Sequence, residues 1–371
     1  MSGNNHSFSR RSRSGGRSNS GGQQRSRRAY HAQGRSRRGP RKDFIDPARF
    51  IKAARPVEET PYTPQNTFKD FAFDALLHRN IQDKGFATPS PIQDQAIPIA
   101  LTGSDIIGIA NTGTGKTAAF ALPVLQHLIA DPNARALIMA PTRELAQQIE
   151  DEFRAFARGS RIFTCLLIGG TPMGRQLRNL GFRPRLVIGT PGRIKDHLER
   201  RSLRLSNFNK VVLDEVDRML DMGFIDDIRF ILEQLPQQRQ SLFFSATMDN
   251  KIRSLIEASS NQPISISVKT GETTDNVDQN VIHYGGDHEK IERLHEILVN
   301  GSGNKVLVFD ETQRSVERLG EELVERGFDA DVIHGGKSQG QRQRALKRFK
   351  ASDVTILVAT DVAARGIDIS D

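Results

Sequence analysis

A glycine-rich octapeptide, residues 110–117 (ANTGTGKT), has the residue types and spacing of a phosphate-binding loop. It follows a short apolar segment and opens an amphipathic one, which is the strand–loop–helix context that such a loop requires. Glycines let the backbone wrap around phosphate oxygens, and a helix N-terminus adds partial positive charge. Lys116 can reach the β- and γ-phosphates, and the Thr117 hydroxyl can ligate Mg²⁺. One departure from the general pattern is Ala110, where glycine is usual.

A second candidate site is the acidic tetrapeptide DEVD at residues 214–217, which follows the apolar run VVL. In α/β sheets, ligands bind at the C-terminal ends of the strands, and this is where such a run delivers its carboxylates. Asp214 would hold Mg²⁺, and Glu215 would orient or deprotonate the attacking water. The two sites together indicate a domain that hydrolyses a nucleoside triphosphate.

The elements that must position these residues alternate between apolar strands and amphipathic helices. Fully apolar strands separated by helices predict a parallel sheet covered on both faces, that is, a doubly wound α/β fold. Seven segments are expected to be strands: SDIIGIA, ARALIMAP, RIFTCLLIGG, RPRLVIGTP, KVVLDEVD, QSLFFSAT and PISISV.

We predict four parts along the chain. Residues 1–66 form a disordered tail and linker, residues 67–268 a first α/β domain, residues 269–279 a polar interdomain linker, and residues 280–371 a second, shorter α/β unit. The alternation restarts in that unit with VIHYG and continues through the strands KVLVFD, DADVIHGG and VTILVAT.

Charge and composition limit the kinds of partner that the chain can have. Residues 1–42 carry twelve Arg/Lys and no Asp/Glu, so with a net charge of +9 overall the rest of the chain sums to −3. Arginine spaced by glycine and serine favours sequence-tolerant binding of nucleic acid, through phosphate contacts and guanidinium stacking. The alternative is a solubilising tail without a specific partner. The chain has no long apolar run that could span a membrane. Its single cysteine, Cys165, excludes an internal disulfide and favours a small buried hydrophobe in a reducing cytoplasm.

From Phe68 to its last residue the chain resembles the DEAD-box ATP-dependent RNA helicases of superfamily 2, whose motifs occur in the family's order. The alanine that opens the phosphate-binding loop is part of this pattern. The matching segments are 85–93 (GFATPSPIQ, the Q motif), 110–117 (motif I), 141–148 (PTRELAQQ, motif Ia), 169–170 (the GG doublet), 190–193 (TPGR, motif Ib), 214–217 (DEVD, motif II), 245–247 (SAT, motif III), VLVFDETQRS (motif IV), Gln339 with Arg342 (the Q-x-x-R element), and 358–368 (VATDVAARGID, motif V).

The resemblance implies two RecA-like domains and assigns roles for ATP and Mg²⁺. Gln93 would hydrogen-bond the adenine and Phe68 would stack on it. The catalytic residues would be Lys116, Asp214, Glu215, Asp217, Ser245 and Thr247, the last two linking the ATP state to domain closure. The nucleotide would contact Phe68, Gln93, Thr112, Gly113, Thr114, Gly115, Lys116, Thr117, Gly366 and Asp368, and Thr117 with Asp214 would hold the metal.

The resemblance also implies an RNA track that recognises sugar and phosphate rather than base sequence, because such contacts carry no sequence information. Contacts to 2′-hydroxyl groups would favour RNA over DNA. The residues implied are Pro141, Thr142, Arg143, Gly170, Thr190, Gly192, Arg193, Gln339, Arg342 and Thr360.

Two departures from the family pattern have consequences. Val216 replaces the alanine of the DEAD tetrapeptide at what we expect to be a buried strand end, and local overpacking there would cost about 1 kcal/mol. The family's pattern also continues beyond motif V with an arginine-bearing motif that acts on the γ-phosphate, and these 371 residues do not contain it. We therefore expect the second domain to be incomplete, and the chain to bind ATP and RNA but to hydrolyse ATP weakly.

Three other interpretations stay open. One is a non-enzymatic RNA-binding protein with a degenerate ATPase core, which the intact Lys116, Asp214 and Glu215 disfavour. Another is a DNA helicase of the same superfamily, which the Q motif and PTRELA disfavour. The third is a short regulatory isoform, which we rank below a fragment.

Overall fold

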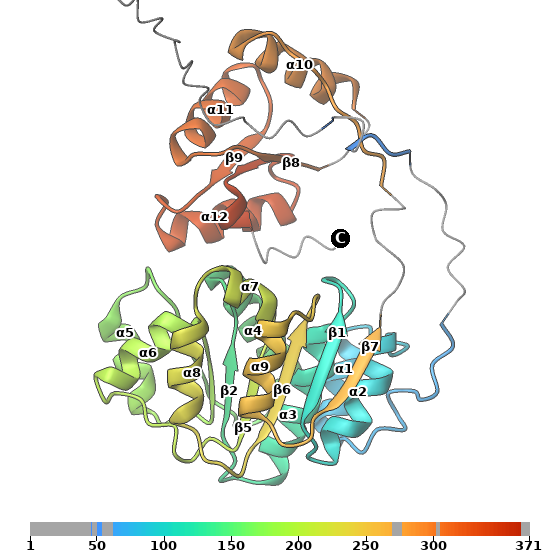
Figure 1. Ribbon diagram of the computed structural model, residues 1–371, viewed down its shortest axis with the longest axis vertical. Helices are drawn as coiled ribbons and strands as arrows, with labels where there is room; N and C mark the ends of the chain where they lie inside the picture. Colours follow the sequence, from blue (N-terminus) through green and yellow to red (C-terminus); the bar gives the residue numbers. More distant parts are fainter. Residues whose placement is uncertain (1–45, 47–49, 54–61, 269–276, 302–304, 365–371) are drawn as a thin grey trace, which may run out of the picture. The chain divides into compact units, whose positions relative to one another are not determined.

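The computed structural model describes residue 46 and residues 50–53, 62–268, 277–301 and 305–364 (Figure 1). Most of the predicted tail, most of the predicted interdomain linker, and the predicted nucleotide contacts Gly366 and Asp368 lie outside these ranges. Within them, no helix combines the length and the apolar character that crossing a membrane requires.

The first domain is built on a seven-stranded sheet in the order β3-β4-β2-β5-β6-β1-β7, and every neighbouring pair is parallel. All seven predicted strands are present, and the doubly wound α/β prediction is confirmed. The strands are β1 Ile106–Ala110, β2 Ala136–Met139, β3 Thr164–Leu167, β4 Leu186–Gly189, β5 Lys210–Leu213, β6 Gln240–Ser245 and β7 Ile264–Val268.

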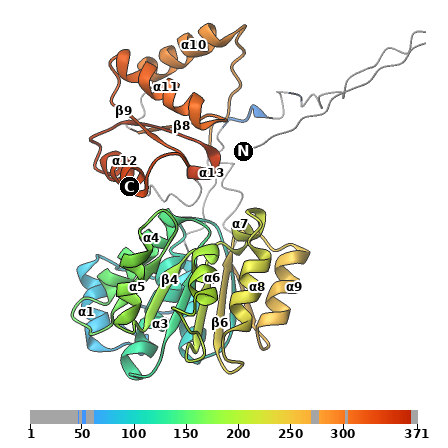
Figure 2. The ribbon, with the colours of Figure 1, turned by 90° about the vertical axis from the view of Figure 1, so that its left-hand side faces the viewer.

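Nine helices in the described part of this domain flank the sheet. They are α1 Ala75–Asp83, α2 Pro91–Leu101, α3 Lys116–Ala130, α4 Arg143–Phe156, α5 Met173–Gly181, α6 Pro191–Glu199, α7 Val216–Asp221, α8 Ile225–Glu233 and α9 Asn250–Ser259. In Figure 2 the sheet separates α1 and α3 on the left from α8 and α9 on the right, so helices cover both of its faces.

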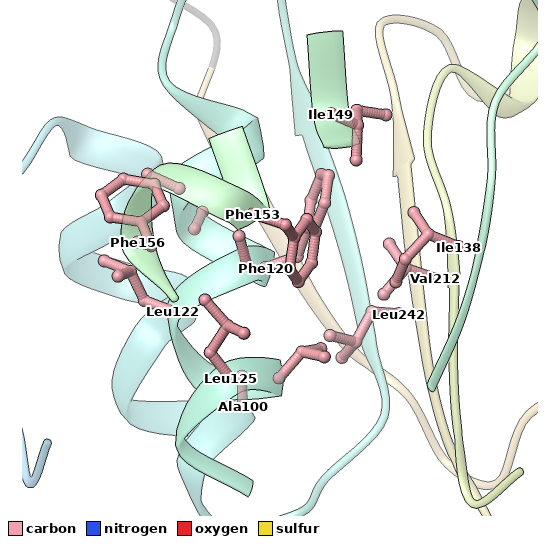
Figure 3. Close-up of a cluster of buried hydrophobic side chains, with 14 of the residues drawn as sticks. Ala100, Phe120, Leu122, Leu125, Ile138, Ile149, Phe153, Phe156, Val212 and Leu242 are labelled. Atoms are coloured by element: carbon pink, nitrogen blue, oxygen red, sulfur yellow. The ribbon is translucent and has the colours of Figure 1, made fainter. Parts of the chain in front are cut away.

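Two hydrophobic clusters fill the two faces, because successive side chains of a strand point to opposite sides. From β2, Ile138 joins one cluster with Phe120 of α3 and Phe153 of α4 (Figure 3), whereas Leu137 joins the other with helices α6 to α9. Cys165 lies in the second cluster, fully buried, and burial raises the pKa of its thiol to about 12. The prediction that it is a small buried hydrophobe is confirmed.

The second domain contains a smaller parallel sheet in the order β8-β10-β9, formed by Val306–Phe309, Ile356–Ala359 and Ala330–Ile333. Residues 281–285 (VIHYG), where the alternation was expected to restart, form no strand, because no strand in the described residues pairs with them. Ile282 and Tyr284 are about half exposed there, at 46% and 51%. The helices of this domain are α10 Asp287–Asn300, α11 Gln313–Glu325, α12 Gln339–Lys350 and α13 Asp361–Ala364.

Candidate functional site

The glycine-rich loop connects the end of β1 to the start of α3, as the sequence predicted. Gly113 and Gly115 have φ angles of 78° and 87°, a left-handed conformation that glycine adopts without strain. Lys116 is the first residue of α3 and is buried, and its Nζ donates a hydrogen bond to the Ala110 carbonyl at 3.0 Å. The ammonium group therefore stays folded back over the loop, where a phosphate oxygen can replace the carbonyl as its partner.

The Q motif is bonded directly to this loop. Ser90 caps α2, and Gln93 closes the capping box by accepting from the Ser90 amide at 2.9 Å. The other end of the same side-chain amide donates to the Gly115 carbonyl at 3.1 Å, and the Ser90 hydroxyl donates to the Thr114 carbonyl at 2.7 Å. A Cβ atom on Gly115 would lie 2.4 Å from Gln93 Nε2, so this contact requires glycine. Gln93, predicted to read adenine, also holds the phosphate-binding loop.

Asp214 and Glu215 form the turn between β5 and α7, and both carboxylates are buried. Glu215 has a φ of 53°, a conformation that costs a non-glycine residue about 1–2 kcal/mol and that turns the chain sharply. Burial, with the neighbouring Asp214 charge adding to it, raises the pKa of Glu215 to about 7. Desolvation by burial also raises the pKa of Asp214, against the favourable charge of Lys116. A carboxylate that titrates near neutral pH is suited to accept a proton from water.

Val216 is fully buried and begins α7, so the expectation that it lies at a strand end is wrong. The difference arises because β5 stops at Leu213 and the left-handed Glu215 separates strand from helix.

Asp217 connects motif II to motif III. Its Oδ2 atom accepts hydrogen bonds from the Ala246 amide at 3.1 Å, the Thr247 amide at 3.0 Å and the Thr247 hydroxyl at 3.1 Å. The Asp217 amide in turn donates to Ser245 Oγ at 3.4 Å. The turn after β5 and the turn after β6 are therefore held as one unit, through the Ser and Thr that the sequence predicted would transmit the ATP state.

The residues predicted to hold Mg²⁺ present suitable atoms. Thr117 offers a half-buried hydroxyl in the first turn of α3, and Asp214 offers Oδ2, since its Oδ1 accepts the Glu215 amide. Mg²⁺ prefers oxygen ligands and keeps several waters, so one hydroxyl and one carboxylate, completed by phosphate oxygens, fit it.

Phe68, predicted to stack on adenine, lies in an aromatic cluster. Its ring meets those of Phe71 and Phe86 edge-on, at centroid distances of 6.0 and 5.9 Å. Only 5% of the residue is exposed. Stacking on adenine therefore stays a prediction, one that requires the base to reach a nearly buried ring.

One residue of this region was missed by sequence reasoning. Asp94 directly follows Gln93, and its buried carboxylate accepts four hydrogen bonds from the segment that precedes Phe68. The donors are Tyr62 Oη at 2.6 Å, the Gln65 amide at 2.8 Å, the Asn66 amide at 3.0 Å and Asn66 Nδ2 at 2.8 Å. These hydrogen bonds, working against desolvation, lower the pKa of Asp94. No sequence signal pointed to it, because the donors lie about thirty residues upstream.

The predicted RNA contacts of the first domain follow three neighbouring strands. Thr142, after β2, caps α4 by accepting from the Leu145 amide at 3.2 Å, and Thr190, after β4, precedes α6. The GG doublet follows β3, and Gly170 has a φ of 74°. The Arg143 guanidinium lies close against the doublet, since a Cβ atom on Gly170 would come within 2.3 Å of its Nη1. The structure thus brings motifs Ia, Ib and GG together.

A buried network that sequence reasoning also missed holds the GG turn to α6. Gln176 of α5 donates from Nε2 to the Ile168 carbonyl at 3.1 Å and to Thr171 Oγ1 at 2.6 Å, on either side of the doublet. Its Oε1 lies 3.3 Å from His197 Nε2, and His197 Nδ1 lies 2.8 Å from Ser202 Oγ. His197 is fully buried on α6, and desolvation lowers the pKa of its imidazole, so the ring is neutral and donates to Gln176.

In the second domain, Gln339 begins α12 and Arg342 lies one turn later on the same helix. Arg342 Nη2 donates to the Ala363 carbonyl of α13 at 3.5 Å. Thr360 directly follows β10, and its carbonyl accepts from the Ala363 amide at 3.0 Å. Three of the predicted RNA contacts thus gather at the C-terminal edge of this sheet.

The strand order divides the C-terminal edge of the first sheet into two halves. The Ia, Ib and GG loops follow β2, β4 and β3, which are adjacent, whereas motifs I, II and III follow β1, β5 and β6, which are also adjacent. Figure 1 shows the strands β2, β5, β6 and β1 side by side with the same direction. One edge therefore carries both candidate sites next to each other.

Comparison with known proteins agrees with this geometry. The sequence matches the DEAD/DEAH box helicase family over residues 90–255 and the helicase conserved C-terminal domain over residues 289–371. It is 44% identical to the DEAD-box ATP-dependent RNA helicase CshA of Bacillus subtilis, over 82% of this chain and 62% of the relative. The Bacillus licheniformis protein of the same name is 43% identical, with 82% and 63% covered. The chain thus spans less than two thirds of these relatives.

Solved structures share both domains. A DEAD box protein from the hyperthermophile Methanococcus jannaschii is 35% identical, with a TM-score of 0.52 over 82% of this chain and 83% of that one. Dbp5 of Saccharomyces cerevisiae, bound to RNA and ADP BeF3, is 26% identical, with a TM-score of 0.71 over 82% and 78%. The two sheets described above are accordingly RecA-like. With its ordered motifs, its parallel sheets and these relatives, the chain belongs to the DEAD-box RNA helicase family.

Proposed function

We propose that the chain is an ATP-dependent RNA helicase that separates short RNA duplexes or remodels RNA–protein complexes. The observation that carries this proposal is the division of one sheet edge into a nucleotide half, formed by the loops after β5, β6 and β1, and an RNA half, formed by the loops after β3, β4 and β2. Dbp5, to which the chain is similar, was solved bound to RNA and ADP BeF3, and this supports a protein that binds both kinds of ligand.

In the nucleotide half, ATP would bind with its phosphates over the glycine-rich loop. Lys116 would exchange its hydrogen bond with the Ala110 carbonyl for one with a phosphate oxygen. Thr117 and Asp214 would hold Mg²⁺, which supplies positive charge to the phosphate oxygens when it is bound. Glu215, with its pKa near 7, would take the proton of the attacking water.

In the RNA half, the strand would contact helix N-termini and backbone amides. Thr142 and Thr190 lie at the N-termini of α4 and α6, which carry partial positive charge, and Arg143 adds a full one. Phosphate contacts of this kind position RNA without reading its sequence. Asp217, bonded to both Ser245 and Thr247, would transmit the state of the nucleotide to closure of the two RecA-like domains.

The proposal is tested by the dependence of the two sites on each other. Affinity for single-stranded RNA should rise when a non-hydrolysable ATP analogue is present, and should exceed the affinity for DNA of the same sequence. Equal RNA affinity with and without the analogue would favour a simple RNA-binding protein, and equal affinity for DNA would favour a DNA helicase.

Three finer expectations also stay predictions. Weak hydrolysis by these 371 residues is tested by ATP turnover with and without RNA, where vigorous stimulated turnover would contradict it. A contribution of the arginine-rich tail to RNA affinity is tested by deleting residues 1–42. A cytoplasmic location is tested by cell fractionation.

A further inference from the structure

A long stretch of the first domain contains basic residues and no acidic residue. Residues 153–195 contain nine Arg/Lys and no Asp/Glu, although the chain outside residues 1–42 is net negative. Several of these cations have partners: Arg154 bonds to Glu150, Lys195 to Asp227, and Arg185 to backbone carbonyls. Five others are exposed and form no ion pair with the rest of the described chain; they are Arg158, Arg161, Arg175, Arg178 and Arg183.

Helix α5 arranges part of this charge as a stripe. It begins three residues after Gly170 and runs from the GG turn, at the C-terminal end of β3, to the start of β4. Arg175 and Arg178 are one turn apart and Phe182, the C-cap residue, follows one turn later. Residues at this spacing share one face of a helix. The stripe therefore leads directly away from the RNA half of the edge.

Two exposed aromatic rings lie where the stripe ends. Phe163 precedes β3 and Phe182 precedes β4, and the parallel register Thr164↔Leu186 brings the two turns together. Their ring centroids are 5.7 Å apart, yet Phe163 is 45% and Phe182 72% exposed. Arg161 and Arg183 flank them in sequence. Exposed aromatic rings between arginines provide stacking surfaces for unpaired bases and cations for the phosphates that join them.

We propose that this surface extends the RNA track beyond the motif loops and binds the single-stranded RNA that leaves them. We call it the arginine face, and it consists of Arg161, Arg175, Arg178 and Arg183 with Phe163 and Phe182. The inference rests on the proposed function of the RNA half. It commits to RNA because the face is continuous with the GG turn through α5 and contains no acid that would repel phosphate.

The experiment compares RNA lengths. The triple variant Arg161→Gln, Arg178→Gln, Arg183→Gln is measured in the full chain with an ATP analogue, against single strands of about six and about 20 nucleotides. We expect the variant to bind the long strand about tenfold more weakly. The slope of log affinity against log salt concentration should become shallower by about two units, because each phosphate contact that is lost reduces the number of counterions released on binding. Affinity for the short strand, which the motif loops accommodate, should not change.

A matched control replaces three exposed arginines elsewhere in the same domain, Arg79→Gln, Arg204→Gln and Arg253→Gln. It removes the same charge and should leave both affinities nearly unaltered. An equal loss in the control would show that only net charge acts, and unchanged affinity of the first variant for the long strand would overturn the proposal. Equal loss on both strands would also overturn it, since the face would then belong to the motif loops.

The aromatic pair supplies an independent arm. The double variant Phe163→Ala, Phe182→Ala should bind the long strand about tenfold more weakly. The salt dependence of binding should not change, because stacking involves no charged contact. Full affinity of this variant for long RNA, or binding of a protein partner that depends on the face while RNA does not, would contradict an RNA surface. Failure of wild type to bind the short strand would instead count against the proposed function itself.

Discussion

The proposed nucleotide half and the proposed RNA half of one sheet edge are built from different chemistry. The nucleotide half uses buried side chains, including Lys116, Asp214 and Glu215, whose charges interact at short range and shift pKa values. The RNA half uses helix N-termini, a glycine turn and an arginine that lies against it. The difference teaches that chemistry on a phosphate bond needs desolvated charged groups, whereas a polyanion can be positioned by helix N-termini and backbone amides.

The largest expected effect lies in the nucleotide half. Glu215→Gln keeps the shape of the side chain but cannot accept the proton of water, so ATP turnover should fall about 10²-fold or more. Affinity for the ATP analogue and for RNA should persist. Single-turnover hydrolysis with excess protein measures the effect, and the exposed Asp226→Asn serves as control. Unchanged turnover in Glu215→Gln would remove the acid from the mechanism.

The two halves should also differ in their response to pH. Glu215 acts as a base only when deprotonated, and its raised pKa of about 7 means that turnover should rise about tenfold between about pH 6 and about pH 8. RNA affinity should stay flat over this range, because the lowered pKa of His197 keeps that ring neutral. A turnover profile as flat as the RNA profile would break this contrast.

A small change in the RNA half should lower RNA affinity and leave nucleotide affinity unchanged. Gly170→Ala strains a φ of 74° and displaces the Arg143 guanidinium, so RNA affinity should fall about tenfold while affinity for the ATP analogue is kept. The control is Gly103→Ala, which has a similar φ of 87° but open space around it, at the other end of β1. An equal loss of RNA affinity in the two variants would mean that backbone strain alone causes it, and full affinity in both would mean that the contact with Arg143 does not affect RNA binding.

The buried network behind the RNA half tests whether positioning contributes. Gln176→Met preserves volume but frees the GG turn from α6, so RNA affinity should fall about fivefold and stability by about 1–3 kcal/mol. Gln240→Met is the matched control. Its amide donates to the Ala100 and Ser104 carbonyls and its oxygen accepts from the buried Lys210 ammonium at 2.7 Å, so Gln240→Met should lower stability at least as much and leave RNA affinity intact. A comparable RNA defect in both would reduce Gln176 to a stability role.

The smallest effect is expected behind the nucleotide half. Asp94→Asn disturbs the hydrogen bonds that hold the segment before Phe68, so affinity for the ATP analogue should fall about threefold, without a change in RNA affinity. Asp105→Asn is the comparison, since this buried carboxylate accepts the Ser241 and Asn261 amides away from the nucleotide loops. Isothermal titration of both variants separates a positioning effect from general destabilisation.

Sequence reasoning succeeded where local pattern and local chemistry coincide. Apolar runs predicted each strand of the large sheet, and the glycine-rich loop and DEVD fall where strands end. It failed where the secondary structure depends on residues outside the segment. Residues 281–285 begin with apolar residues but have no neighbouring strand in the described ranges. Val216 joins a helix because the left-handed Glu215 turns the backbone just before it.

The amino-acid sequence by itself determined the family, the order of the elements and the residue types at each motif, because these depend on neighbours within a few positions. Only the tertiary structure decided which groups are buried together. It raised the pKa of Glu215 by desolvation beside Asp214, tied Asp217 to the turn after β6, and joined Gln176 to His197. It also aligned the arginines of α5 with two phenylalanines from separate turns, since strand pairing brings distant residues together.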